Sequence, residues 1–229
     1  MNIKLSDHFS YAKLIRFTIP SIFMMIFTSI YGVVDGYFVS NFVGKTPFAA
    51  VNLIMPFLMI LGTVGFMFGT GGSALVSKTY GEGNKEKAVK LFSLFIYITI
   101  IIGVTLTILA FIFLKPIAIF LGAEGKMLEQ CLIYGRISLI SMPAFILQLE
   151  FQSFFVTAEK PQLGLFVTIA AGVTNMVLDA LFIAVFNWGI AGAAWATALG
   201  PFISLLLMFY WIFVKKDTYL SYNLKDFHN

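Results

Sequence analysis

Three acidic residues, Asp35, Glu150 and Asp179, lie inside long apolar stretches of the sequence. An ionised carboxylate in the middle of a membrane costs roughly 2.5 to 3.5 kcal/mol, so each must face protein or water and have a partner. Carboxylate oxygens bind hard cations, and a buried pair of carboxylates can also hold a proton. These residues therefore predict chemistry with Na⁺ or H⁺.

Asp35 and Asp179 are expected at the same depth as other oxygen-bearing side chains. At 1.5 Å per residue, both lie roughly 10–12 Å below the outer surface. Asn175 precedes Asp179 by one helical turn and shares its face. The alternative is that these groups hydrogen-bond to one another and hold helices together without exchanging an ion. The sequence predicts a cation or proton site formed by Asp35, Asn175, Asp179, Thr197 and Tyr134. If the ion is Na⁺, we expect the first four of these residues to bind it.

Glu150 lies nearer the cytoplasmic end of its apolar stretch, between Gln148 and Gln152. We expect Glu150 and Gln152 to be candidates for a cavity that takes up cationic substrate from the inside. A structural role for Glu150 is the alternative. We assign no function to Arg136, which can reach the outer interface or pair with an acid.

The elements that position these residues are predicted to be membrane-spanning helices. The chain has 229 residues, of which 59% are hydrophobic and 11% charged, and its mean hydropathy is +0.92. A soluble domain carries roughly 25% charged residues, so a soluble fold is excluded. The apolar runs are continuous, whereas the strands of a membrane barrel alternate apolar and polar residues. Lipid offers no partners for backbone groups, so each run must be a helix.

Six spans are predicted, and they form an all-α membrane bundle over residues 1–214. Eleven Lys and Arg residues fall on one side of these spans and three on the other, which places both termini in the cytoplasm. Residues 215–229 are expected to be a cytoplasmic tail or the start of a linker. The spans are 14–43, 48–76, 91–114, 128–157, 163–186 and 189–214.

Several classes of function are disfavoured by the composition. The single cysteine, Cys131, excludes an internal disulfide and a cysteine zinc site, and both histidines lie in the terminal segments. The HExxH and GxSxG motifs of intramembrane or surface enzymes are missing from the sequence. The net charge of +4 fits loops that face an anionic leaflet rather than nucleic acid. We expect no enzyme activity and no cofactor beyond a coupling ion.

Small residues and prolines mark where helices approach or bend. Gly65 and Gly69 form a GxxxG pair that allows close helix packing. Each proline inside a span removes one backbone hydrogen bond and permits a bend. The prolines within or at the edge of spans are Pro20, Pro56, Pro143 and Pro201.

Four segments in order resemble the MATE (multidrug and toxic compound extrusion) transporters, with the greatest likeness to bacterial DinF-like and MepA-like members. They are residues 20–44 with VDGYFV at 34–39, YGEGNK at 80–85, NMVLD at 175–179 and GIAGAAWAT at 189–197. The resemblance implies one lobe, the N-terminal one, of a transporter with two six-helix lobes. It also implies a cation site at the four residues predicted above and a bend at Pro20.

The resemblance implies export of organic cations, drugs or toxic compounds in exchange for inward Na⁺ or H⁺ across the bacterial cytoplasmic membrane. The expected partners are lipid, small organic cations, and a C-terminal lobe or a second copy of the chain. A lipid-linked oligosaccharide flippase of the same superfamily is an alternative, but it would need several basic cavity residues, and only Arg136 is a candidate. A non-transporting membrane assembly subunit is a further alternative.

Overall fold

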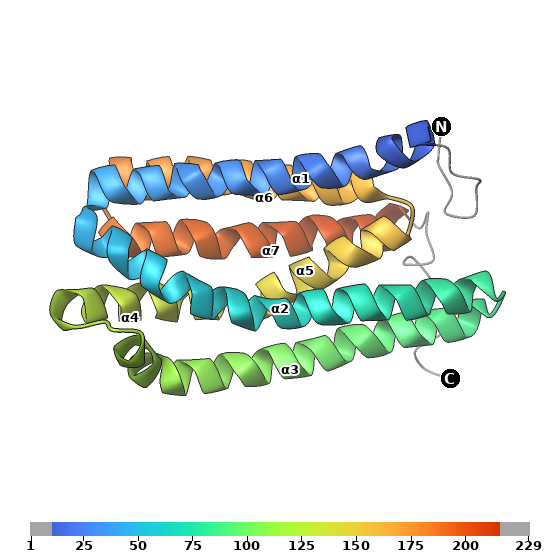
Figure 1. The fold of residues 1–229 in the computed structure, drawn as a ribbon, viewed down its shortest axis with the longest axis horizontal. Coiled ribbons are helices and arrows are strands. Elements are labelled where there is room, and N and C mark those ends of the chain that lie inside the picture. The colour runs from blue at the N-terminus through green and yellow to red at the C-terminus, as the bar shows by residue number, and fades with distance from the viewer. Residues whose placement is uncertain (1–10, 216–229) are drawn as a thin grey trace.

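The computed structural model describes residues 11–215, and their side chains as far as residue 210. These residues form an all-helical bundle (Figure 1). The helices are α1 (Tyr11–Phe38), α2 (Lys45–Gly81), α3 (Lys85–Phe120), α4 (Gly125–Ile140), α5 (Met142–Thr157), α6 (Pro161–Asp179) and α7 (Gly189–Lys215), and the π-helical segments are η1 (Val39–Val43) and η2 (Ala180–Val185).

The helices run side by side as membrane-crossing elements. Within residues 11–215, five helical stretches are long and apolar enough to span a bilayer, and the bent pair α4 and α5, taken as one span, makes a sixth. The chain is therefore a multi-pass membrane protein. Helix α3 extends beyond the predicted span at both ends, so the limits of the membrane within the helices stay predictions. Of the predicted tail, all but Lys215 lies outside the described residues.

The fourth span is broken in its middle. Helices α4 and α5 meet at an angle of 56°. Pro143 stands in the first turn of α5, where it has no N–H to donate and its ring would crowd the carbonyl of Leu139. At the break, the Ser138 carbonyl accepts hydrogen bonds from both the Ser141 hydroxyl, at 2.9 Å, and the Ser141 backbone N–H, at 3.2 Å.

Two π-helical segments follow the acidic residues of α1 and α6. In η1 the Gly44 N–H donates to the Val39 carbonyl at 3.0 Å, and in η2 the Phe186 N–H donates to the Leu181 carbonyl at 2.8 Å. The two segments contact each other, and both contact α7. Short π segments of this kind occur often at functional sites.

Helices α2 and α5 pack closely because α2 presents glycines to α5. A Cβ atom at Gly65 would meet the Ile146 carbonyl oxygen, and a Cβ at Gly69 would lie 2.9 Å from the Cα of Glu150. The close approach predicted from the GxxxG pair is confirmed. This contact fixes which face of α5 is turned toward α2.

Candidate cation site and cavity

A cavity of about 900 Å³ lies inside the bundle. In the view of Figure 1, α7 and α5 are seen between α1 and α2, and α3 lies on the far side of α2 from α1. Lining residues of α1 and α2 that include Val33, Tyr37, Met59 and Phe66 are exposed at the molecular surface. The cavity therefore opens on the face between α1 and α2.

Four of the five predicted ion-site residues line this cavity. They come from four helices, Asp35 from α1, Tyr134 from α4, Asn175 from α6 and Thr197 from α7. The fifth, Asp179, is fully buried and does not line the cavity itself, but its carboxyl group lies close enough to interact electrostatically with that of Asp35. The structure thus brings the predicted set together.

The hydroxyl of Tyr134 connects the members of this group. It lies beside the Thr197 and Ser138 hydroxyls. It is also close enough to the carboxyl groups of Asp35 and Asp179 to interact electrostatically with both. Within the part of the chain that the structure describes, six buried oxygens of this group have no hydrogen-bond partner: Asp35 Oδ1, both Asp179 carboxyl oxygens, Asn175 Oδ1, Thr197 Oγ1 and the Tyr134 hydroxyl.

This donor set suits a hard cation or a proton. Its six unpartnered atoms are carboxyl, amide or hydroxyl oxygens. Such oxygens bind Na⁺, and a carboxyl oxygen can also bind a proton. Burying such oxygens without a partner costs free energy, and a bound ion or proton would offset that cost. Among the described residues, no group of three or more His, Cys, Asp or Glu side chains is placed to hold a metal ion. The site therefore offers two carboxyls supplemented by neutral oxygens.

Sequence reasoning overlooked two members of this neighbourhood. Tyr31 lies beside Asp35 and lines the cavity, and Ser138 lies beside Tyr134 and lines it as well. Each is four residues from its neighbour, which places it on the same face of its helix. Because that spacing is visible in the sequence, it could have been used to predict both Tyr31 and Ser138.

The remaining predicted residues are not part of the ion-site group. Gln152 lines the cavity, and its side-chain N–H donates to the Thr168 hydroxyl at 3.2 Å. Glu150 is fully buried next to Thr99 of α3 and is not among the lining residues. Pro20 is buried within α1, which continues through it as one helix. Arg136 is exposed and does not line the cavity.

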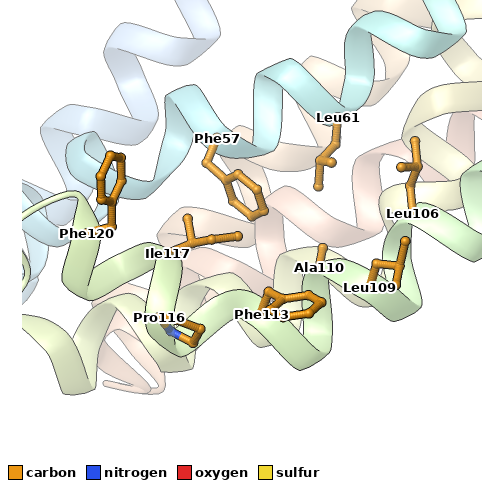
Figure 2. A pocket seen from close by; sticks show the side chains of 9 residues that line it. All are labelled: Phe57, Leu61, Leu106, Leu109, Ala110, Phe113, Pro116, Ile117 and Phe120. Carbon is orange, nitrogen blue, oxygen red and sulfur yellow. The ribbon is translucent and has the colours of Figure 1, made fainter.

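A second hollow of about 390 Å³ lies between α2 and α3 (Figure 2). Figure 2 shows Phe57 and Leu61 of α2 opposite Phe113 and Ile117 of α3. All nine described residues that line it have apolar side chains, so they offer no group for ion or proton chemistry.

Comparison with known proteins assigns the chain to a family. The MatE family signature matches residues 20–181. The chain belongs to the MatE family. This is a family of multidrug export transporters rather than enzymes, and the predicted resemblance is confirmed. Multidrug export protein MepA of Staphylococcus aureus strain MRSA252 is 27% identical over 215 residues. The match covers 94% of this chain and 48% of MepA.

Solved structures agree with the fold. An outward-facing multidrug resistance MATE transporter of the MOP superfamily superimposes with a TM-score of 0.87 at 28% identity, covering 94% of this chain and 48% of the other. A MOP superfamily transporter from Pyrococcus furiosus, whose reversed pocket polarity suggests a different function, gives a TM-score of 0.86 at 28% identity over 94% of this chain and 47% of its own. The chain spans about half the length of these relatives and matches one lobe.

Proposed function

We propose that this chain forms the N-terminal lobe of an antiporter that exports small organic cations in exchange for Na⁺ or H⁺. The observation that carries the proposal is the cavity, which brings four oxygen-bearing residues of the predicted ion site to one wall. Members of one superfamily differ in the polarity of the pocket. The substrate class must therefore be argued from this chain's own residues.

The charge of the cavity favours a cationic substrate. Asp35 is the only charged residue among the described residues that line it. Gln148, Gln152 and Thr168 add neutral polar groups, and the rest of the wall is largely apolar. An apolar cavity with a few convergent polar groups is typical of small-molecule sites. A pyrophosphate-linked lipid would need basic wall residues, so the flippase alternative is disfavoured.

Ion coupling follows from the two carboxyl groups. Asp35 and Asp179 cannot both stay ionised at close range in a dry interior without a compensating cation, so the pair holds Na⁺ or a proton. Binding removes their mutual repulsion and allows α1 to shift about Pro20. Because Asp35 also lines the cavity, the ion and the substrate then bind in exchange.

Transport is proposed to need a second body. Alternating access proceeds by rocking one repeat against another around a central site. The cavity of this lobe opens on the face between α1 and α2, where exposed apolar side chains such as Val33 and Phe66 border it. We infer that a C-terminal lobe or a second copy of the chain covers this face.

Orientation is proposed from the basic residues. Helix α1 begins and α7 ends at the end of the bundle that carries the α2–α3 connection (Figure 1), and Lys13, Lys78 and Lys85 lie there. That end is proposed to face the cytoplasm of a bacterium. Cysteines introduced at Lys45 and Asn84 in a Cys131→Ser background test this, and labelling of position 84 alone from the outside would refute it.

The transport proposal is tested by flux in proteoliposomes. Uptake or release of a fluorescent organic cation is followed under imposed Na⁺ and H⁺ gradients, for the chain alone and with a matching C-terminal lobe. Gradient-dependent flux is expected for the completed protein. Efflux by a strictly monomeric preparation would overturn the requirement for a second body, and failure of every two-lobe preparation to move the cation would leave the assembly subunit as the better reading.

A further inference from the structure

Glu150 is a buried acid that the proposed ion site does not use. Its neighbours along α5, Gln148 and Gln152, line the cavity, whereas Glu150 does not. Glu150 instead lies where α5 meets α2 and α3. Its backbone is close to Gly69 of α2, and its carboxyl group lies beside the Thr99 hydroxyl of α3.

Within the described part of the chain, no charged side chain compensates this carboxyl group. Among the described residues, both of its oxygens and the Thr99 hydroxyl are buried without a hydrogen-bond partner. The titratable residues on the helices packed against α5 lie elsewhere. Asp179 of α6 lies beside Asp35, and Tyr97 of α3 and Tyr210 of α7 are exposed. The others lie toward the ends of α2 and α3 (Lys45, Lys78, Tyr80, Lys85, Glu86, Lys87, Lys90 and Lys115) or on α4 (Lys126, Glu129, Cys131, Tyr134 and Arg136).

The surroundings of Glu150 are also dry. The ring of Phe151 lies 6.2 Å from that of Phe92 and 5.9 Å from that of Phe209, which closes the space between α3, α5 and α7. An ionised carboxylate without a partner is very costly in such a place. Glu150 is therefore held as a neutral acid with the Thr99 hydroxyl beside its carboxyl group.

Hydroxyl groups continue from Glu150 toward one end of the bundle. Ser73 and Ser77 follow Gly69 at intervals of four residues, so they share its face of α2. On α5, Ser153 lies against Gly69, and Thr157 follows it by four residues. The two helices run in the same direction here, because Gly65 meets Ile146 and Gly69 meets Glu150.

We propose that Glu150 and Thr99 form a second, proton-binding site, and that the α2–α5 contact connects it through hydroxyl groups to the bundle end carrying the α2–α3 and α5–α6 connections. One carboxyl and one hydroxyl are too few oxygens for a metal ion, so the site takes a proton alone. On release the Glu150 O–H bond breaks and a water molecule at that end becomes hydronium, and uptake is the reverse. Each hydroxyl group on the way accepts one proton and passes one on, so it ends unchanged. This inference rests on the proposed ion-coupled transport and adds a site to it.

Infrared spectroscopy of the chain in lipid bilayers tests the proposal without measuring transport. In an Asp35→Asn, Asp179→Asn background, Glu150 is the remaining buried acid among the residues that the structure describes. Its protonated C=O stretch is isolated as the difference from the same protein carrying Glu150→Gln. We expect that band at neutral pH, a changed frequency in Thr99→Val, and a downshift after transfer to D₂O. Glu159→Gln, in the connection between α5 and α6, is the matched control and should keep the band.

Two results would overturn the proposal. The first is no protonated band at neutral pH, which would mean that Glu150 is ionised. The second is a band that stays at its H₂O position in D₂O for as long as the protein is folded, which would make Glu150 a sealed structural acid. If the band behaves as expected while proteoliposomes show no coupled flux, the proposed transport fails and this proton site stands.

Discussion

Asp35 and Asp179 differ from Glu150 in what surrounds their carboxyl groups. Asp35 and Asp179 face each other among amide and hydroxyl oxygens beside a cavity of about 900 Å³. Glu150 faces a single hydroxyl in a helix contact built on glycine. Acidic residues that look alike in a hydropathy profile thus have different chemistry available. We propose that the open group exchanges ions with the cavity and that the packed one exchanges only a proton.

The largest effect is expected from a substitution that disrupts the contact between α2 and α5 around Glu150. Gly65→Val places a side chain against the Ile146 carbonyl oxygen, so α2 and α5 must separate. Overpacking of this kind costs about 1–3 kcal/mol or more. We expect loss of folded protein, measured by thermal unfolding in detergent. The matched control is Gly71→Ala, where nothing lies within 4 Å of the added atom, and it should change stability by less than about 1 kcal/mol.

Removing a neutral oxygen from the proposed ion site beside the cavity should have a smaller effect. Asn175→Ala and Thr197→Ala each remove one buried oxygen of the proposed ion site. A hydrogen-bonding group of this kind contributes about 1 kcal/mol, so we expect roughly fivefold weaker dependence of flux on the driving ion. The concentration of Na⁺ or H⁺ that gives half-maximal flux measures this. Unchanged values for both variants would show that these residues only line the wall.

A substitution at Gln152 tests whether this part of the cavity wall affects the substrate rather than the driving ion. Gln152→Leu removes the hydrogen bond to Thr168, and we expect roughly a fivefold change in KM for an organic cation, since one hydrogen bond is worth about 1 kcal/mol. The dependence on the driving ion should stay as in the unmodified protein. A change in ion dependence with an unchanged KM would assign Gln152 to the ion site instead.

The smallest effect is expected at Arg136. Its side chain is exposed and lies apart from the cavity lining, and exposed charges contribute about 0–1 kcal/mol to stability. Flux of an organic cation through Arg136→Ala should stay within about twofold of the unmodified protein in the same vesicles. A large loss of flux would instead support the alternative in which a basic residue binds an anionic substrate.

The helical class and the membership of the family were predictable from the sequence, because long apolar runs must be helices in lipid and the four segments occur in family order. The convergence of Asp35, Tyr134, Asn175 and Thr197 on one cavity was also predictable from depth, since it depends mainly on residue rise along each helix.

The position of Glu150 and the break at Ser141 were not predictable in the same way. Which face of α5 meets the cavity depends on how Gly65 and Gly69 seat α5 against α2, and hydropathy does not report that rotation. Pro143 marked a possible bend, but its size depends on whether neighbouring groups satisfy the freed carbonyls. The π segments after Asp35 and Asp179 depend on contacts between distant parts of the chain in the same way.

The shared ion site is tested most directly by comparing Asp35→Asn and Asp179→Asn in a completed two-lobe protein. The amide keeps the shape of each side chain, so folding should be retained and can be checked by thermal unfolding. If the two carboxyls bind one ion between them, each variant and the double variant should reduce Na⁺- or H⁺-dependent efflux to the background of protein-free vesicles. Full ion-dependent efflux in both single variants would contradict the account and leave the pair as structural hydrogen-bonding groups.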